Sequence, residues 1–245
     1  MITVHGLTKS FGRQAVLRGI DLEVPEGSIT IVIGRSGGGK SVFLRHLLGL
    51  VRPDAGRILI DGVDVTGLRG RGFDRVRERY GVVFQSGALF DSLTCAENVA
   101  FPLREKTRMP GAEVAARVVK GLEQVGLGDV GDKYPAEVSG GMRKRVAIAR
   151  ALVTEPAIVF FDEPTTGLDP ILVNTIHGLI GDLHRRLRFT AVVVSHEIPE
   201  IFELADTVAM LHEGRIIEVG PPEAIQSSEN PIVQQFIRGE PEGRI

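Results

Sequence analysis

Four short runs of apolar residues recur along the chain, and each has the length of a buried strand. Their near-continuous hydrophobicity, rich in Val, Ile and Phe, is typical of parallel strands that are covered on both faces. We therefore expect a mainly parallel core sheet assembled from segments far apart in the sequence. The runs are ITIVI (29–33), YGVVFQ (80–85), AIVFFD (157–162) and TAVVVSH (190–196).

Longer segments with a helical spacing of apolar residues lie between these runs. In one of them Val114, Val118, Leu122 and Val125 recur at i, i+4, i+8 and i+11, which forms a single apolar stripe. Alternation of strands and helices predicts an α/β fold. The expected helices cover 40–49, 112–126, 139–154 and 171–187.

Other segments depart from this alternation. Residues 1–27 and RILIDGVDV (57–65) have the pattern of antiparallel strands joined by tight turns. VAMLHEGRIIEVG (208–220) predicts a late hairpin with Gly214 at its turn. Residues 86–154 carry little strand pattern, so we expect a helical lobe of two or three helices there.

Composition and charge narrow the class of protein. A chain of 245 residues suits one large domain, and a net charge of −2 provides no overall field that would attract nucleic acid. The single cysteine, Cys95, excludes an internal disulfide and fits a reducing compartment. The start MITVHGLTKSFG lacks the apolar core of a signal peptide, and no apolar run approaches the roughly 18 residues of a membrane span. Any action on a membrane would therefore need a partner that spans it.

The segment GRSGGGKS, residues 34–41, matches the pattern G-x-x-x-x-G-K-[ST] of a phosphate-binding loop. It follows an expected strand and precedes an expected helix, which is the context that the pattern requires. Glycines let the backbone curve around phosphates and point its N–H groups inward. We expect Lys40 to reach the β- and γ-phosphates of a nucleotide and Ser41 to hold Mg²⁺. A Gly-rich turn without a ligand is the weaker interpretation.

A pair of acidic residues ends the run IVFFDEP (158–164). Ligands of α/β sheets bind at the carboxyl ends of the strands, where this pair is expected to lie. Asp162 can hold Mg²⁺ directly or through water, and Glu163 is placed to act as the general base on the attacking water. Taken alone, the pair would be an acidic turn before Pro164; the phosphate-binding loop makes the catalytic interpretation the stronger one.

Five further segments, together with the two motifs above, stand in the order typical of one family. On these segments the chain resembles the ATPase subunit of an ABC transporter along essentially its whole length. KSFGRQAVL places Phe11 where the family stacks an aromatic ring on adenine. VSGGMRKR resembles the family signature, with Val138 in place of leucine and Met142 in place of glutamine. The segments are KSFGRQAVL, GVVFQ, VSGGMRKR, TTGLDP and VVVSHE.

The resemblance implies ATP and Mg²⁺ as cofactors and assigns roles to particular residues. The residues implied in catalysis are Glu163, His196, Lys40 and Gln85. The residues implied in metal binding are Ser41, Gln85 and Asp162. The residues implied in nucleotide binding are Phe11, Gly34, Arg35, Ser36, Gly37, Gly38, Gly39, Lys40, Ser41, Val42, Ser139, Gly140, Gly141 and Asp169.

Taken without their order, several of these residues have plainer interpretations. Gln85 alone would be a polar strand end, Phe11 a core residue, and His196 a hydrogen-bonded histidine after a strand. The run Arg143–Arg145 alone would be a solvated helix face. Their order and spacing are what point to the family.

The segment SGGMRKRVAIAR poses a further question, because Ser139 is a good helix N-cap and yet cations follow it closely. Cations near a helix N-terminus oppose the helix dipole by up to about 1 kcal/mol each. The resemblance implies an answer: two chains pack head to tail, and each ATP lies between one chain's phosphate-binding loop and the other's Ser139–Gly141. Phosphate binding and contacts within the lobe would then offset the unfavourable charge.

The resemblance also narrows the kind of ABC protein. The interval from Gln85 to Ser139 is too short for the long coiled coil of chromosome-maintenance ATPases, and the chain has room for one such domain, not the two of the translation-factor relatives. FQSGALFDSLTCAENVAFPLREKTRMP, SGGMRKRVAIARAL and NPIVQQFIRG resemble the Mla-type family of phospholipid transporters. Two alternatives stay open: the ATPase of a small-solute importer, such as one for amino acids, and a regulatory ATP-binding subunit without a transport role.

The same resemblance implies an organisation and a setting. We expect one ABC ATPase domain over 1–245, with a RecA-like core and antiparallel β part in 1–85 and 155–220, the helical lobe in 86–154 and a C-terminal tail in 221–245, frayed at GEPEGRI. The expected assembly is a homodimer with ATP at its interface, bound to integral-membrane permease subunits and served by a lipid-binding delivery partner, without nucleic acid. The expected location is the cytoplasmic face of the inner membrane.

Overall fold

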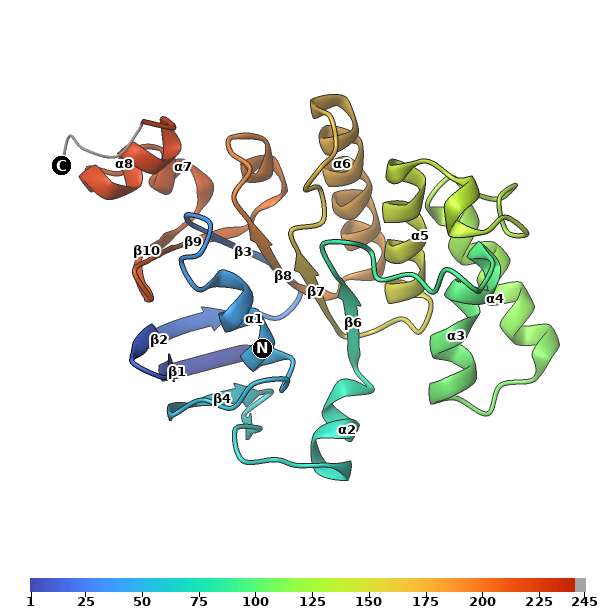
Figure 1. Cartoon of the computed structure of the whole chain (residues 1–245), viewed down its shortest axis with the longest axis horizontal. Helices are drawn as coiled ribbons and strands as arrows, with labels where there is room; N and C mark the ends of the chain where they lie inside the picture. The colour runs from blue at the N-terminus through green and yellow to red at the C-terminus, as the bar shows by residue number, and fades with distance from the viewer. Residues whose placement is uncertain (241–245) are drawn as a thin grey trace. The chain divides into compact units, whose positions relative to one another are not determined.

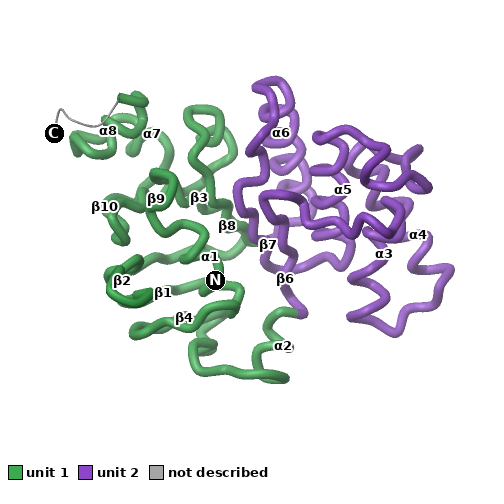
Figure 2. Tube along the Cα trace, in the orientation of Figure 1, with its two compact units in different colours: residues 1–77, 190–245 green, residues 78–189 purple. Residues whose placement is uncertain are grey.

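The computed structural model describes residues 1–240, and these residues fall into two compact units (Figure 2). The first unit comprises Met1–Arg77 and Thr190–Ile245, and the second comprises Glu78–Phe189. Each unit contains parallel strands and helices, which confirms the α/β fold. The last five positions of the GEPEGRI segment lie outside the described residues.

The first unit contains an antiparallel sheet in the strand order β2-β1-β4-β5. Its longest pairing joins β1 to β2, with Ile2 opposite Val24 and Phe11 opposite Gln14 at the turn. Most of the apolar side chains of these strands are buried, but Phe11 and Val63 are exposed. The strands are β1 (Ile2–Phe11), β2 (Gln14–Val24), β4 (Ala55–Ile60) and β5 (Val63–Asp64).

A second set of strands in this unit has the order β10-β9-β3-β8. Strand β3 pairs in parallel with both β8 and β9, and Ile33 lies opposite Ser195 and Met210. Strands β9 and β10 form the expected antiparallel hairpin around Gly214. The bounds are β3 (Ile29–Ile33), β8 (Thr190–Ser195), β9 (Thr207–His212) and β10 (Arg215–Gly220).

Short helices complete the first unit. Helix α1 contacts strand β2 of the antiparallel sheet and strand β8 of the other set, so its buried face joins the two (Figure 1). The pattern analysis did not predict α2, α7 or α8, which are each five to seven residues long and too short for a clear period. The helices are α1 (Lys40–Leu47), α2 (Arg71–Arg77), the 3₁₀ turn η2 (Glu200–Leu204), α7 (Pro222–Gln226) and α8 (Pro231–Ile237).

The second unit contains the parallel strand pair β6 and β7 and four helices. Helix α5 contacts β6, α3, α4 and α6, so it lies at the centre of this unit (Figure 1). The expected stripe of Val114, Val118, Leu122 and Val125 is buried. The elements are β6 (Tyr80–Val83), α3 (Cys95–Lys106), α4 (Gly111–Gln124), η1 (Pro135–Glu137), α5 (Gly140–Leu152), β7 (Ile158–Asp162) and α6 (Pro170–Leu187).

The helices of residues 86–154 confirm the expected helical content of that stretch. In the compact units these helices are grouped with β6, β7 and α6. Within residues 1–240, no helix combines the length with the apolar character that a membrane span requires.

Candidate nucleotide-binding site

The phosphate-binding loop follows β3 and runs directly into α1, as the sequence predicts. Gly34 has a φ of +151°, and a Cβ at this position would collide with the backbone carbonyl of Leu211 on β9. Gly39 is the N-cap of α1 with a φ of +104°, and the first turn of α1 holds no acidic residue. Only glycine fits such a close and left-handed backbone, which leaves the N–H groups at the start of α1 for an anion.

Lys40, the first residue of α1, is 4% exposed. Its Nζ donates to the carbonyl of Gly34 at 2.6 Å and to that of Arg35 at 3.0 Å. The ammonium therefore lies over the loop that precedes it, inside the curve of the backbone. This is the place where a cation can meet the phosphates of a nucleotide.

His196 lies at the same end of the sheet as the phosphate-binding loop. Ile33 and Ser195 are register partners in the parallel pair of β3 and β8, so Gly34 and His196 each follow the last residue of neighbouring strands. Arg35 and His196 also line one cavity of about 410 Å³, together with Gln235 and Phe236 of α8. The structure thus brings together two motifs that are separated by more than 150 positions in the sequence.

Phe11 lies at the turn between β1 and β2 and is 50% exposed. Lys9 Nζ lies 5.5 Å from the centre of its ring and also forms an ion pair with Asp54 at 2.7 Å. Phe11 is therefore a surface aromatic residue and not a core residue. An exposed aromatic face can stack on a nucleobase.

The acidic pair ends strand β7 in the second unit. Val83 and Phe161 are register partners in the parallel pair of β6 and β7, so Asp162, the last residue of β7, and Gln85, shortly after β6, lie at neighbouring strand ends. Glu163 has a φ of +48°, a left-handed conformation that is uncommon for a residue with a side chain. Thr166 Oγ1 donates to Glu163 Oε2 at 3.1 Å, which orients the carboxylate. A strained backbone with an oriented carboxylate is common at catalytic positions.

Asp169 has a structural role that the motif comparison did not indicate. Its Oδ1 accepts hydrogen bonds from the backbone N–H groups of Ile171 and Leu172, both at 3.1 Å, and so caps helix α6. An aspartate directly before the Pro at the first helical position is a sequence signal that could have revealed this cap. Ile171, next to it, is 80% exposed, which is unusual for a large apolar side chain.

The signature segment begins helix α5 as predicted. Ser139 is exposed, and its Oγ accepts from the N–H of Met142 at 3.3 Å. The first turn holds no acidic residue, so the helix start stays favourable for an anion. Arg143 Nη1 donates to the carbonyls of Pro135 and Val138 at 3.4 and 3.3 Å.

Lys144 and Arg150 of α5 hold the backbone that follows β6, and the sequence did not predict this role. Lys144 is 7% exposed, and its Nζ donates to the carbonyl of Gln85. Arg150 donates to the carbonyls of Gly87 and Ala88, both at 2.7 Å. The interpretation of Arg143–Arg145 as a solvated helix face is therefore wrong for Lys144, because its side chain is buried and donates to the backbone.

Each unit holds one part of the expected site. The first unit contains Phe11, the loop of residues 34–42 and His196. The second unit contains Gln85, Ser139–Gly141, Asp162, Glu163 and Asp169. Within each unit the residues lie at strand ends and helix starts, where α/β folds bind ligands.

The polar groups present fit a nucleotide-bound Mg²⁺ better than a metal held by the protein alone. Residues 1–240 contain no group of three or more His, Cys, Asp or Glu side chains placed to hold a metal ion. Mg²⁺ keeps several waters and is usually bound by one or two protein oxygens together with substrate phosphates. The hydroxyl of Ser41 and the carboxylate of Asp162 are oxygen ligands of the type that Mg²⁺ prefers.

The chain matches the ABC transporter family over residues 17–166. "Intermembrane phospholipid transport system ATP-binding protein MlaF" of Escherichia coli (strain K12) is 38% identical over 245 residues, which are 100% of this chain and 91% of that protein. "Probable ribonucleotide transport ATP-binding protein mkl" of Mycobacterium leprae is 42% identical over 238 residues, which are 97% of this chain and 69% of that protein. For the Mycobacterium tuberculosis relatives of the same name the covered share is 66% of their length.

Solved structures of ATP-binding cassettes share the fold. CbiO1 from Clostridium perfringens, part of the ABC transporter complex cbiONQ, has a TM-score of 0.86 at 32% identity, over 97% of this chain and 94% of that chain. The cassette MJ0796, in a dimeric post-hydrolysis state bound to ADP and Pi, has a TM-score of 0.82 at 31% identity, over 91% of this chain and 99% of that chain. With its phosphate-binding loop, acidic strand end and signature helix in the family's order, the chain belongs to the ABC transporter family and is an ATPase of that family.

Proposed function

We propose that this chain is the ATP-hydrolysing subunit of a phospholipid transporter. The observation that carries the cargo assignment is the match to MlaF of Escherichia coli and Haemophilus influenzae, 38% and 39% identical over the whole of this chain and over more than nine-tenths of theirs. The match includes the segment of residues 84–110, where ABC ATPases receive their permease. A protein at the cytoplasmic face of the inner membrane, attached through its permease, fits this role.

The residues divide the work on ATP as follows. Phe11 stacks on adenine, and the backbone N–H groups of residues 37–42 hold the phosphates. Lys40 leaves its two carbonyls in the phosphate-binding loop to contact the β- and γ-phosphates. Ser41, Asp162 and Gln85 would hold Mg²⁺, which would supply positive charge to the phosphates. His196 contacts the γ-phosphate from its neighbouring strand end.

Hydrolysis needs a base beside the γ-phosphate, and Glu163 supplies it. Its carboxylate takes a proton from the attacking water as the new P–O bond forms and the bond from the γ-phosphorus to the bridging oxygen breaks. The electron pair of that bond stays on ADP. The hydrogen bond from Thr166 and the strained backbone hold Glu163 in a single orientation, which reduces the entropy that must be lost on reaching the transition state.

Two copies of the chain share each ATP. Ser139 is exposed at the start of a long helix whose first N–H groups are open to an anion, although the same chain already has a phosphate-binding loop. Asp169 and the exposed Ile171 lie at the start of the next helix and provide polar and apolar contacts for the second copy. A solved dimeric cassette of the same fold supports this arrangement. Loss of the γ-phosphate removes the charge that bridges the copies and lets them separate.

A groove in the second unit fits the permease. It has a volume of about 310 Å³ and contains the partly exposed rings of Phe84, Phe90 and Phe101. Phe90 and Phe101 contact each other with ring centres 4.8 Å apart. Lys106 and Arg150 also line the groove. An apolar helix of the permease with an acidic or carbonyl end would cover these rings. A lipid-binding protein on the far side of the permease completes the proposed system.

The cargo is tested by purifying the complex from its native membrane and analysing the bound small molecules by mass spectrometry. Phospholipid enriched relative to the bulk membrane, together with a multi-span permease, is the expected result. The mycobacterial relatives named for ribonucleotide transport make nucleotides the second candidate. A complex with a permease but without lipid enrichment would overturn the phospholipid assignment. A chain without any permease would support a regulatory subunit instead.

The shared site is tested with dimers in which two affinity tags select the composition. One dimer pairs a Lys40→Ala chain with a Gly141→Asp chain, so that one site receives both changes and the other receives none. The other dimer places both changes on one chain and pairs it with an unaltered chain, so that each site receives one change. We expect hydrolysis in the first dimer and near-background hydrolysis in the second.

The opposite ranking would show that each site is complete within one chain. Gly141→Asp is suited to the test because a carboxylate facing the γ-phosphate at about 4 Å would be repelled by roughly 4 kcal/mol at an effective dielectric of 20. Gly141→Ala is the matched control, because its methyl adds no charge and only tightens the contact with Leu172, whose side chain would lie 3.3 Å from the new Cβ.

A further inference from the structure

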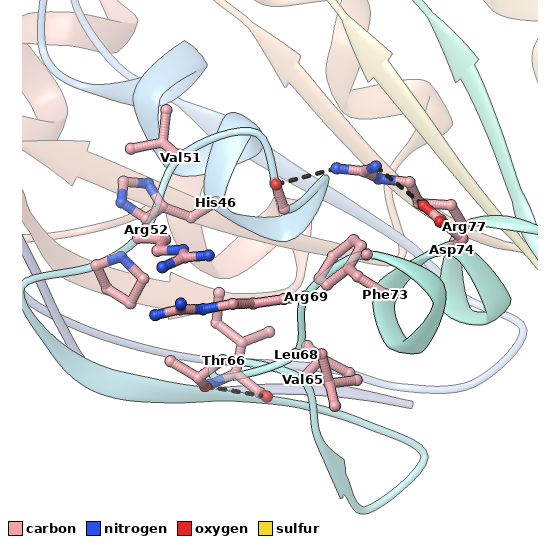
Figure 3. A pocket seen from close by; sticks show the side chains of 14 residues that line it. His46, Val51, Arg52, Val65, Thr66, Leu68, Arg69, Phe73, Asp74 and Arg77 are labelled. Atoms are coloured by element: carbon pink, nitrogen blue, oxygen red, sulfur yellow. Dashed lines mark hydrogen bonds and ion pairs between the residues drawn. The ribbon is translucent and has the colours of Figure 1, made fainter.

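We propose that a cavity at the C-terminal end of α1 binds a phosphate group, either of a soluble phosphate compound or of a phospholipid headgroup (Figure 3). The cavity has a volume of about 160 Å³ and lies wholly within the first unit. Its polar wall is formed by His46, Arg52, Thr66, Arg69 and Arg77. This inference does not depend on the cargo proposed above, and the cavity is separate from the phosphate-binding loop, which lies at the other end of α1.

Two arginines reach this cavity from different loops. Arg52 follows α1, whereas Arg69 precedes α2, and Figure 3 shows both guanidinium groups without a dashed contact. Among residues 1–240, neither side chain has a hydrogen bond or an ion pair. Two uncompensated guanidinium groups beside one cavity repel each other, and an anion between them removes that repulsion. Guanidinium groups match the geometry of phosphate through paired N–H donors.

Arg77, in contrast to Arg52 and Arg69, has hydrogen-bond partners and an acidic neighbour. Its guanidinium donates to the carbonyls of Leu48 and Gly49, at 3.2 and 3.0 Å, and lies 3.5 Å from the carboxylate of Asp74. Asp74 is the only acidic residue among those that line the cavity. Because Asp74 is engaged by Arg77, it leaves Arg52 and Arg69 uncompensated.

His46 lies in the wall of the same cavity. The side chain is 1% exposed, its Nδ1 lies 2.7 Å from the carbonyl of Val42, and its buried Nε2 has no hydrogen bond. A carbonyl partner requires a proton on Nδ1, so the neutral ring presents a lone pair at Nε2. Nε2 is enclosed by protein, so a phosphate between the arginines would act on the ring through its charge, which makes the ring of His46 a reporter of binding.

The ionisation state of His46 agrees with this assignment. Burial lowers the pKa of His46, and the positive charge of Lys9 lowers it further, whereas the carbonyls of Val42 and Arg52 and the charge of Asp54 act to raise it. Burial is the largest of these effects, so the ring is neutral at pH 7. Arg52, Arg69, Arg77 and Asp74 are the other charged groups around the cavity.

The apolar part of the wall makes the cavity a fixed shape. Phe73 is buried, and a Cβ at Gly49 would collide with its ring, so α1 and α2 meet too closely to rearrange. Arg77 lies over the same ring, 4.8 Å from its centre.

The test uses the full chain with its ATP site saturated with Mg²⁺ and a non-hydrolysable ATP analogue, whose γ-phosphate fills the position that inorganic phosphate could take beside ADP. Inorganic phosphate is titrated while the ring signal of His46 is followed by NMR, with His46→Gln to assign that signal among the six histidines. In parallel, sedimentation measures binding to phosphatidylcholine vesicles with and without phosphatidic acid. We expect saturable movement of the His46 signal by phosphate, or binding that requires phosphatidic acid, and the arm that responds identifies the source of the phosphate.

Matched variants decide whether the response belongs to the cavity. Arg52→Gln with Arg69→Gln should weaken it at least tenfold, and Arg52→Lys with Arg69→Lys should weaken it less because the charge is kept. The pair Arg71→Gln and Arg75→Gln removes the same charge from exposed positions of α2 that do not line the cavity. This pair should change the response to phosphate or to phosphatidic acid less than twofold.

All four arginines are exposed, so the variants should keep the melting temperature of the original chain, which circular dichroism checks. No response in either arm overturns the proposal. Equal weakening by the two Gln pairs also overturns it, because the effect would then be one of overall charge.

Discussion

Arg150 Nη2, on α5, donates a hydrogen bond of 2.7 Å to the backbone carbonyl of Gly87 in the loop after β6. Lys144, on the same helix, holds the carbonyl of Gln85 in the same way. The loop also packs on the helix, since a Cβ at Gly87 would lie 3.5 Å from that of Ala147. The signature Ser139 caps the start of helix α5, so the signature and the loop that we propose to face the permease are attached to one helix.

Replacing Arg150 should therefore disturb the communication between permease and ATP more than the binding of ATP. Arg150→Ala removes two hydrogen bonds from a charged donor, each worth roughly 1.5–3 kcal/mol when both partners are buried and less here because the side chain is partly exposed. We expect ATP affinity within twofold of the original and a loss of most permease-stimulated hydrolysis. Measured on the purified complex, the ratio of stimulated to basal ATPase activity reports the effect.

Arg117→Ala is the control, because its side chain forms only an exposed pair with Glu113 on α4, at 3.6 Å. It should leave both activities unchanged. If Arg150→Ala keeps full stimulation by the permease, the attachment of the loop to α5 has no part in coupling.

Glu163→Gln should keep ATP binding and nearly abolish turnover. The amide keeps the shape and the contact with Thr166 but cannot accept the proton, and loss of a general base typically lowers a rate by about 10²–10⁴. The variant should also accumulate as an ATP-bound dimer, which size-exclusion chromatography detects. Near-normal turnover by the variant would remove Glu163 from the chemical step.

Lys40→Ala should lose nucleotide affinity as well as rate, in contrast with Glu163→Gln. The ammonium is buried against two carbonyls of the phosphate-binding loop, so its loss removes both the charge on the phosphates and the support of the loop. A fluorescent ATP analogue titrated against the two variants measures the contrast. Normal affinity in Lys40→Ala would show that the side chain does not contact the phosphates in the ground state.

Asp54 should make the first unit sensitive to acid. The pKa of the Asp54 carboxyl is lowered mainly by the hydrogen bond from Lys9 and secondly by the hydrogen bond from the N–H of Ser10. Because the pKa of Asp54 is lower in the folded state than in the unfolded state, its ionised form stabilises the fold at pH values above the ordinary aspartate pKa of about 3.9. This stabilisation is lost as the pH falls through the folded-state pKa. Urea unfolding should show Asp54→Asn less stable than the original at pH 7 and equally stable in stronger acid.

Asp91→Asn serves as the comparison for Asp54, since Asp91 is exposed and its side chain has no hydrogen bond or ion pair within residues 1–240. A difference between Asp54→Asn and the original chain that persists unchanged into strong acid would mean that the lost stability does not come from ionisation.

Cys95 should resist alkylation in the folded protein. Its side chain is fully buried at the start of α3, and burial, followed by the charge of Glu137, raises the pKa of the thiol. Both effects keep the thiolate, which is the reactive form, scarce and inaccessible. Iodoacetamide at pH 8 should label the protein in denaturant and not in buffer, with Cys95→Ser as the unlabelled reference. Rapid labelling of the folded chain would contradict the burial of this thiol.

The sequence by itself determined the order of the motifs, the strand and helix positions that carry them, and the family. This was possible because phosphate binding, strand burial and helix capping each act over a few adjacent residues: GRSGGGKS, IVFFDEP and Ser139 carry their own local signals. The short helices α2, α7 and α8 were not predicted because five to seven residues are too few to establish a helical spacing of apolar positions.

Only the tertiary structure decided which groups the charged side chains contact. Lys144 belongs to a run that alone would be a solvated helix face, and the sequence assigned no contact to Arg150. Both bind carbonyls about sixty positions away, and no local pattern encodes such a distance. Arg52 and Arg69 belong to separate loops, and His46 to a helix, but the packing of α1 against Phe73 places all three on one cavity. The energy of a charge depends on which groups surround it in space, and that arrangement exists only after the chain has folded.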